Sequence, residues 1–158
     1  MRISVLRFLP ILLMTLLPLT AHALQAGERL ASWTLLDQHD QPYTLNDQTR
    51  TLLVARSMDA AKMVNAALQD KPKGFLESRQ TVFVADIQKM PTLIARMFAI
   101  PKMRDYSYRV ILDRDARIVP RYAGDDDKVL WLQLRDRQVV SQQQFSSAEQ
   151  LRAALQRP

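Results

Sequence analysis

The sequence predicts an α/β fold: a three-layer sandwich in which helices flank a mixed central sheet, extended at its N-terminal side by a β-hairpin. Two observations predict it. Extended and helical segments alternate through the middle of the chain, which implies parallel strands joined by right-handed crossovers. A hairpin followed by a helix then closes the sequence. The chain shows no internal repeat and no linker, so a single domain is expected.

The first 23 residues have the pattern of a secretory signal peptide. Two arginines precede an apolar run of about 12 residues, and Ala21 and Ala23 place small side chains at both positions of an A-x-A cleavage site. A membrane-spanning helix needs about 20 apolar residues, so the run is too short to serve as an anchor. We therefore predict a signal peptide over 1–23, one domain over 24–158, a periplasmic location in a Gram-negative cell, and no stable membrane insertion after cleavage.

The composition excludes several kinds of chemistry. The chain has 158 residues and no cysteine, which excludes thiol–disulfide exchange, thiol peroxidase activity and cysteine-ligated metal sites. Its three glycines form no phosphate-binding loop, and no cofactor is expected. Removal of the signal peptide lowers the net charge from +6 to +4, which weakly favours anionic partners. No block of Lys and Arg is interleaved with aromatic residues, so nucleic-acid binding is not expected.

The first part of the domain begins with two extended segments. They are expected at Trp33–Leu36 and Tyr43–Leu45, with a polar turn between them, and they form the N-terminal hairpin. Thr51–Ala55 is a continuous apolar run of strand length, which predicts a strand covered on both faces. Apolar residues at helical spacing then predict a helix over Asp59–Leu68, with Asp59 placed to cap its start.

The middle of the chain predicts a second strand and helix. Thr81–Asp86 is the clearest β run, and Met90–Ile100 is predicted as a helix that ends before Pro101. The apolar face of that helix is expected at four positions: Leu93, Ile94, Met97 and Phe98.

The last third of the chain predicts a strand, a connector, a hairpin and a helix. The strand is expected at Tyr108–Leu112, and for Ala116–Tyr122 a short helix and a continuing strand both stay open. A hairpin is predicted over residues 128–142. In the final helix, Ser146 and Glu149 have the spacing of a capping box.

Two segments resemble the thioredoxin-like superfamily in its peroxiredoxin and TlpA-like branches. Gly27–Leu45, with Trp33, Leu35 and the Asp37-Gln38 pair, is similar to the opening of those proteins. Tyr108–Tyr122, which reads Y-R-V-I-L-D-R-D-A-R-I-V-P-R-Y, is similar to their strand, Asp-x-Asp and short-helix segment. Within this superfamily the chain most resembles the YtfJ-like periplasmic proteins, which are thioredoxin-like without behaving as obvious oxidoreductases. The resemblance covers nearly all of the chain that follows the signal peptide.

The resemblance places a candidate site between the strand at 51–55 and the helix after it. Redox members carry a reactive cysteine there, because the helix amino terminus lowers the pKa of the thiol. In this chain the junction is Arg56–Lys62 and holds no thiol, and the cis-proline expected near Lys128 is absent too. We predict no catalytic residue and no metal, and a face that binds another periplasmic protein or peptide. Its residues are Arg56, Ser57, Met58, Asp59 and Lys128.

The alternative is an enzyme or electron-transfer accessory with a non-thiol site on the same face. His39 lies between two aspartates of a turn, where a solvated loop is the favoured interpretation over a metal site. Asp113-x-Asp115 and the run 125–127 are likewise interpreted as solvated turns, since they lack the glycine and distant glutamate of a calcium loop.

The stretch 102–121 is rich in basic residues: Lys102, Arg104, Arg109, Arg114, Arg117 and Arg121. The favoured interpretation is a solvated face whose charges pair with Asp105, Asp113 and Asp115. A patch for an anionic partner or a membrane surface is the alternative. The sequence leaves the oligomeric state open.

Overall fold

The computed structural model describes residues 24–157, so the predicted signal peptide lies outside the described residues. The strands are β1 (Thr34–Asp37), β2 (Pro42–Thr44), β3 (Thr51–Ala55), β4 (Thr81–Asp86), β5 (Ile111–Asp113), β6 (Val129–Arg135) and β7 (Gln138–Phe145). The helices are α1 (Met58–Leu68), α2 (Phe75–Ser78), α3 (Thr92–Ile94), the π-helical turn η1 (Ala95–Ala99), α4 (Ile100–Met103), the 3-10 turn η2 (Val119–Arg121) and α5 (Ala148–Gln156). Within 24–157 none of these helices is both long enough and apolar enough to cross a membrane.

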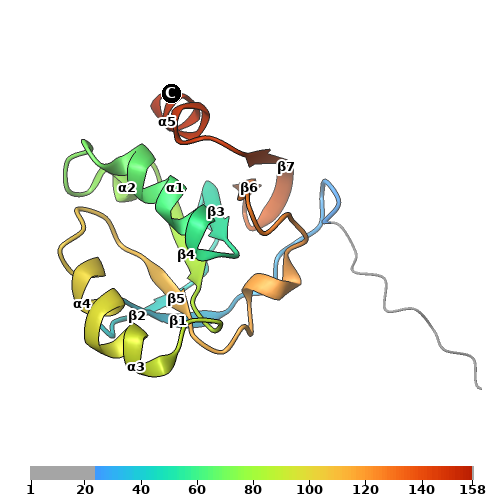
Figure 1. Ribbon diagram of the computed structural model, residues 1–158. Coiled ribbons are helices and arrows are strands. Elements are labelled where there is room, and N and C mark those ends of the chain that lie inside the picture. Colours follow the sequence, from blue (N-terminus) through green and yellow to red (C-terminus); the bar gives the residue numbers. More distant parts are fainter. Residues whose placement is uncertain (1–23, 158) are drawn as a thin grey trace, which may run out of the picture.

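The seven strands form one mixed sheet in the order β2-β1-β5-β4-β3-β6-β7 (Figure 1). β3, β4 and β5 run parallel to one another, and all other neighbours are antiparallel. The N-terminal hairpin β1–β2 therefore lies at one edge of the sheet and the hairpin β6–β7 at the other. This arrangement is the predicted α/β sandwich with an N-terminal hairpin extension.

The sheet separates two apolar cores. On one face Leu53 and Phe83 pack with α1, α2, α5 and the helical segment 92–103. On the other face Leu52 and Val54 pack with the N-terminal segment, η2 and Trp33. Because successive strand residues point to opposite faces, the same strands supply both cores. All five residues of β3 are buried, so the prediction of a strand covered on both faces is confirmed.

The helix predicted over Met90–Ile100 is shifted in the structure. It starts after Pro91 and continues to Met103, so the prediction that it ends before Pro101 was wrong. Pro101 lies in the first turn of α4, directly after the π-helical turn, in which the Ile100 N–H donates to the Ala95 carbonyl. Proline lacks an N–H, so the helix must lose one backbone bond here. The π turn changes the pairing at that point and lets the helix continue.

The predicted apolar face of this helix does not pack on the core. Its four residues are exposed to solvent: Leu93, Ile94, Met97 and Phe98. Ala95, Ile100 and Met103 are buried in their place. Apolar side chains occupy more than one side of this helix, so the sequence pattern alone does not determine which side faces the sheet.

Two helices are capped by a different residue from the one predicted. Ser57, not Asp59, caps α1, and its Oγ accepts the N–H of Ala60 at 3.2 Å. Asp59 lies in the first turn instead. In α5 the cap is Ser147 and not Ser146, and its Oγ accepts the N–H three residues further on. At each of these two helix starts the chain has two polar residues that could cap the helix, and the local pattern does not determine which of them does.

Candidate functional site

The structure places Arg56, Ser57, Met58 and Asp59 at the junction between β3 and α1. Ser57 has extended backbone dihedrals, and its hydroxyl occupies the helix amino terminus where redox thioredoxin-like proteins carry a thiol. β3 and β6 pair antiparallel with Ala55 opposite Val129, so the next step in this register brings Lys128 beside Arg56. Four consecutive residues and Lys128 therefore lie at the carboxyl end of β3.

The loop 123–128 is fastened across this junction. The Ser57 hydroxyl donates to the Asp126 carbonyl at 2.5 Å, and the Arg56 guanidinium forms an ion pair with the Asp126 carboxylate at 3.5 Å. Arg56 also donates to the backbone carbonyls of Val119, at 3.1 Å, and Tyr122. The Ser57 hydroxyl therefore both caps the helix and anchors the loop.

Lys128 belongs to the same loop but faces Asp125. Its Nζ lies 2.6 Å from the Asp125 carboxylate, and this hydrogen bond raises the pKa of Lys128 above its ordinary value. A second cation, Lys89, reaches the Asp126 carboxylate at 3.7 Å. Charges of both signs are therefore paired at this edge.

Met58 and Asp59 take no part in these pairs. Met58 is 41% exposed, and the Asp59 carboxylate contacts only Lys62 in α1, at 3.5 Å, among the described residues. Met58 borders a cavity of about 170 Å³, which we call the Met58 cavity. Its lining comes from α1, β4, the helical segment 92–103 and the residues before β5: Met58, Ala61, Lys62, Asn65, Phe83, Ala85, Ala99, Lys102, Met103, Tyr106, Tyr108 and Val110.

The Met58 cavity is mainly apolar, and its polar groups are few. The Tyr108 hydroxyl donates to Asn65 Oδ1 at 2.9 Å, and the rings of Tyr106 and Tyr108 stack with centroids 5.0 Å apart. Burial raises the pKa of both tyrosines, so they stay neutral at physiological pH. No carboxylate and no histidine line the cavity. Its ionisable groups are Lys62 and Lys102 beside the two tyrosines.

The sequence did not reveal the partners that complete this site. Asp126 was interpreted only as part of a solvated turn, yet it contacts Ser57 from 69 residues away. Lys89 was not singled out, and the Met58 cavity is built from four separate segments. No local signal identifies such contacts, because they depend on how the strands are ordered in the sheet.

The turn around His39 has a structural role. Asp37 is buried and accepts the N–H groups of His39 and Gln41, at 2.7 and 2.9 Å, and the Nε of Arg109 at 2.6 Å. Burial acts to raise the pKa of Asp37, but these hydrogen bonds and the Arg109 charge outweigh it and hold the pKa below its ordinary value. Within residues 24–157 no three His, Cys, Asp or Glu side chains gather as a metal site.

Asp113 corrects the interpretation of its segment as a solvated turn. Its carboxylate is fully buried and accepts three backbone N–H groups, from Arg117, Ile118 and Val119, at 2.7 to 2.9 Å. It therefore holds the connector into η2 and pairs with no cation of the basic stretch among the described residues. Arg109 pairs with Asp37, and Arg104 and Arg114 pair with Asp40, whereas Arg117 pairs with Asp115 as predicted.

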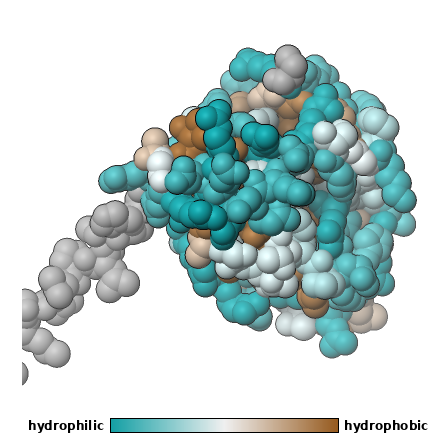
Figure 2. All heavy atoms as spheres, turned by 180° about the vertical axis from the view of Figure 1, so that it is seen from behind, coloured by the Kyte–Doolittle hydropathy of each residue, from teal (hydrophilic) through white to brown (hydrophobic). Residues whose placement is uncertain are grey.

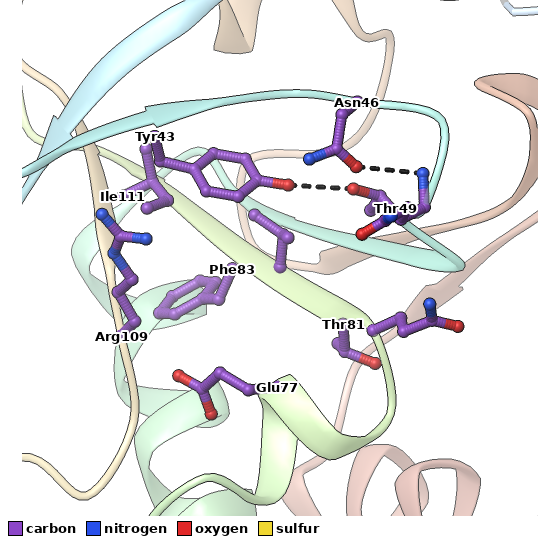
Figure 3. A pocket seen from close by; sticks show the side chains of 11 residues that line it. Tyr43, Asn46, Thr49, Glu77, Thr81, Phe83, Arg109 and Ile111 are labelled. Carbon is purple, nitrogen blue, oxygen red and sulfur yellow. Dashed lines mark hydrogen bonds between the residues drawn. The ribbon is translucent and has the colours of Figure 1, made fainter.

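A second apolar cavity, of about 190 Å³, lies at the opposite end of the parallel strands, where β4 and β5 begin (Figure 3). Tyr43, Phe83 and Ile111 line it, and the Tyr43 hydroxyl is 2.9 Å from Thr49 Oγ1. Arg109 borders this cavity but is committed to Asp37, so its guanidinium serves the fold. The side of the molecule opposite to the view of Figure 1 is largely hydrophilic, with apolar side chains in small separate patches (Figure 2).

The comparisons with known proteins give the fold. No family model and no curated protein matches the chain. A peroxidoxin, BcpB, from Mycobacterium tuberculosis matches in structure with a TM-score of 0.54, 14% identity and coverage of 84% of this chain and 96% of that one. A peroxiredoxin-like protein from Aquifex aeolicus matches with a TM-score of 0.54 and 11% identity, over 85% of this chain and 87% of that one. The thioredoxin domain of a thiol-disulfide oxidoreductase from Bacteroides vulgatus matches with a TM-score of 0.53 and 11% identity, over 84% of this chain and 99% of that one.

These neighbours establish the class. The chain has a thioredoxin-like fold, as the resemblance in its sequence implied, and it holds no cysteine. At these identities the likeness extends to the fold and not to the activity.

Proposed function

We propose that this chain is an exported, non-redox thioredoxin-like domain that binds a protein or peptide segment at the junction Arg56–Asp59 and the loop 123–128. The observation that carries the proposal is the Met58 cavity beside that junction, an apolar hollow bordered by an exposed methionine. One apolar side chain of a partner fits such a hollow, while the partner's backbone passes over the junction.

The state of the polar groups supports binding over catalysis. Ser57 is engaged as a cap and loop anchor, and Arg56, Lys89 and Lys128 are paired with acids of the loop. A hydrolytic or proton-transfer site needs an acid or base free to reach the substrate. The junction instead offers fixed polar groups beside an apolar cavity that Met58 borders, and a recognition site likewise combines polar and apolar contacts.

The size of the cavity sets the expected affinity. Burial of one Leu, Met or Phe side chain contributes about 1.5–3 kcal/mol, which corresponds to roughly a 10- to 150-fold change in binding. A partner held mainly by this anchor is expected to bind transiently. Asp59 and Lys62, which are exposed beside the cavity, would select among partners by charge.

The test fills the cavity. Ala61 lines it, so Ala61→Leu places a larger side chain where the anchor would bind, whereas Ala153→Leu makes the same change at an exposed position of α5. Peptides are selected from a random display library on the unchanged chain, and their affinities for all three forms are measured by fluorescence polarisation. We expect the selected peptides to share an apolar residue and to bind about tenfold or more weakly to Ala61→Leu only.

Three results would contradict the proposal. One is the absence of any enriched peptide, and another is equal binding to the three forms, provided that thermal unfolding shows each to be folded. The third is catalysis of insulin reduction by dithiothreitol, at a rate that the chain raises above that of dithiothreitol alone. Lys128→Glu, matched with Arg135→Glu at an exposed site, tests whether the loop takes part in binding.

Export has its own test. The full chain is expressed in a Gram-negative host and the periplasmic fraction is isolated. We expect a product whose amino terminus is Leu24, because cleavage is predicted after Ala23. An unprocessed chain in the cytoplasm would contradict export and leave the peptide-binding proposal standing.

A further inference from the structure

The helical segment that follows β4 carries an apolar surface on which no other part of residues 24–157 packs. The side chains of Leu93, Ile94, Met97 and Phe98 are 66, 46, 60 and 62% exposed. Scattered exposed apolar residues are common, but four large ones on adjoining turns of one helix form a continuous stripe. We call these four residues the exposed helix face. None of them lines the cavities described above or the basic cavity described next.

The segment is also strongly basic. Residues 87–104 contain four cations and no Asp or Glu: Lys89, Arg96, Lys102 and Arg104. An amphipathic surface of this composition, with large apolar side chains beside Lys and Arg, is typical of segments that lie in the interface of an anionic membrane.

A basic cavity adjoins the same segment. It measures about 560 Å³ and is lined by Arg96, Arg104 and Arg114, with Thr92 and Ala95 from the helix wall. The one carboxylate in its lining, Asp40, pairs with Arg104 at 3.4 Å and Arg114 at 3.0 Å, which leaves the cavity with an excess of positive charge. The Nε of Arg114 is buried and has no hydrogen-bond partner in the part of the chain that the structure describes. Guanidinium groups bind phosphate through paired hydrogen bonds, so this cavity suits a phosphate group.

We propose that the exposed helix face and the basic cavity together form a docking surface for an anionic phospholipid membrane. The apolar stripe would enter the region between headgroups and acyl chains, while Arg96, Arg104 and Arg114 receive a headgroup phosphate. This proposal stands independently of the peptide site.

Charge and shape favour a membrane over other occupants. A second copy of the chain would bring two basic segments together, which costs electrostatic energy. An acidic protein would need a groove that matches four projecting side chains. A bilayer interface accepts projecting apolar groups without a matching groove, and its anionic headgroups complement Arg96 and the excess positive charge of the basic cavity.

The absence of cysteine makes a local test possible. A single thiol is introduced by Met97→Cys, or by Phe98→Cys as a second position, and labelled with an environment-sensitive fluorophore in the full chain. The control label is at Ser141→Cys, an exposed residue of β7. Labelled proteins are mixed with vesicles of phosphatidylcholine alone or with phosphatidylglycerol added, and lipid-borne nitroxide serves as quencher. Because the reporter is local, attachment through any other part of the chain does not produce its signal.

We expect the label at 97 or 98 to brighten and to be quenched by the nitroxide only with phosphatidylglycerol, and the label at Ser141 to stay unchanged. Arg96→Gln should weaken vesicle binding about fivefold, as expected for one charge near an anionic surface, while Arg135→Gln changes it less than about twofold. Labels at 97 and 98 that remain in water in either vesicle overturn the proposal. So does an acidic peptide that brightens them when the vesicles do not, because it would assign the face to a protein.

Discussion

Tyr122→Phe is expected to destabilise the fold by leaving a buried donor without an acceptor. The Trp33 indole N–H donates to the Tyr122 hydroxyl at 2.7 Å, and the two residues are only 6 and 4% exposed. The substitution removes one oxygen and hardly changes the volume of the core. A buried N–H left unpaired costs about 1–3 kcal/mol, so we expect a loss of about 2 kcal/mol in the free energy of unfolding. In a domain of this size that lowers Tm by roughly 5–10 °C.

A double-mutant cycle separates this hydrogen bond from packing. Trp33→Phe also removes the donor but leaves a cavity, so its own cost is larger and mixed. Once the donor is gone, removal of the Tyr122 hydroxyl should cost about 1 kcal/mol less than it does in the unchanged chain. Urea unfolding followed by circular dichroism measures all four forms. The reasoning is refuted if Tyr122→Phe changes the unfolding free energy by less than about 0.3 kcal/mol, or if the two changes are additive within that margin.

Three further predictions concern other buried or strained positions. Asp113→Asn should lower the unfolding free energy by about 2–4 kcal/mol in urea, because an amide cannot accept all three backbone N–H groups that the carboxylate holds; an effect below about 1 kcal/mol would contradict this. Ala116 has a φ of 50°, so Ala116→Gly should raise stability by about 1 kcal/mol in thermal unfolding, and a loss of stability would show that the left-handed conformation is not strained. The folded pKa of Asp37 lies below its ordinary value, so the folded state binds fewer protons and stability falls as pH drops below about 4; Asp37→Asn should flatten that acid limb, measured as Tm against pH.

The local sequence pattern was sufficient to predict two of the central strands. Thr51–Ala55 and Thr81–Asp86 were predicted to the residue, because each is a run of β-forming side chains bounded by turns. The strand predicted at Tyr108–Leu112 is in fact Ile111–Asp113. Tyr108 instead turns its hydroxyl to Asn65 and its ring toward the core, and only the tertiary structure supplies those partners.

The candidate site shows the same division. The resemblance to thioredoxin-like proteins suggested Arg56–Asp59 and Lys128 as one face, and antiparallel pairing of β3 with β6 brings the two segments together in the structure. That the loop is fastened by Asp126 could not be predicted, since the contact depends on loop conformation. The exposed helix face was identified as apolar but not as exposed, because a helix with apolar residues on several sides can present any of them to the sheet.

The two proposed surfaces share one helical segment but use different sides of it. Ala99, Lys102 and Met103 line the Met58 cavity, whereas Phe98, one residue before Ala99, belongs to the exposed helix face. A peptide held in the cavity would therefore lie beside any membrane that this face contacts. The assignment to separate sides predicts separable effects. Ala61→Leu should weaken peptide binding and leave vesicle binding unchanged. Arg96→Gln should weaken vesicle binding and leave peptide binding unchanged. If either variant reduced both kinds of binding, the two sites would be one continuous surface, and their separate assignment would be wrong.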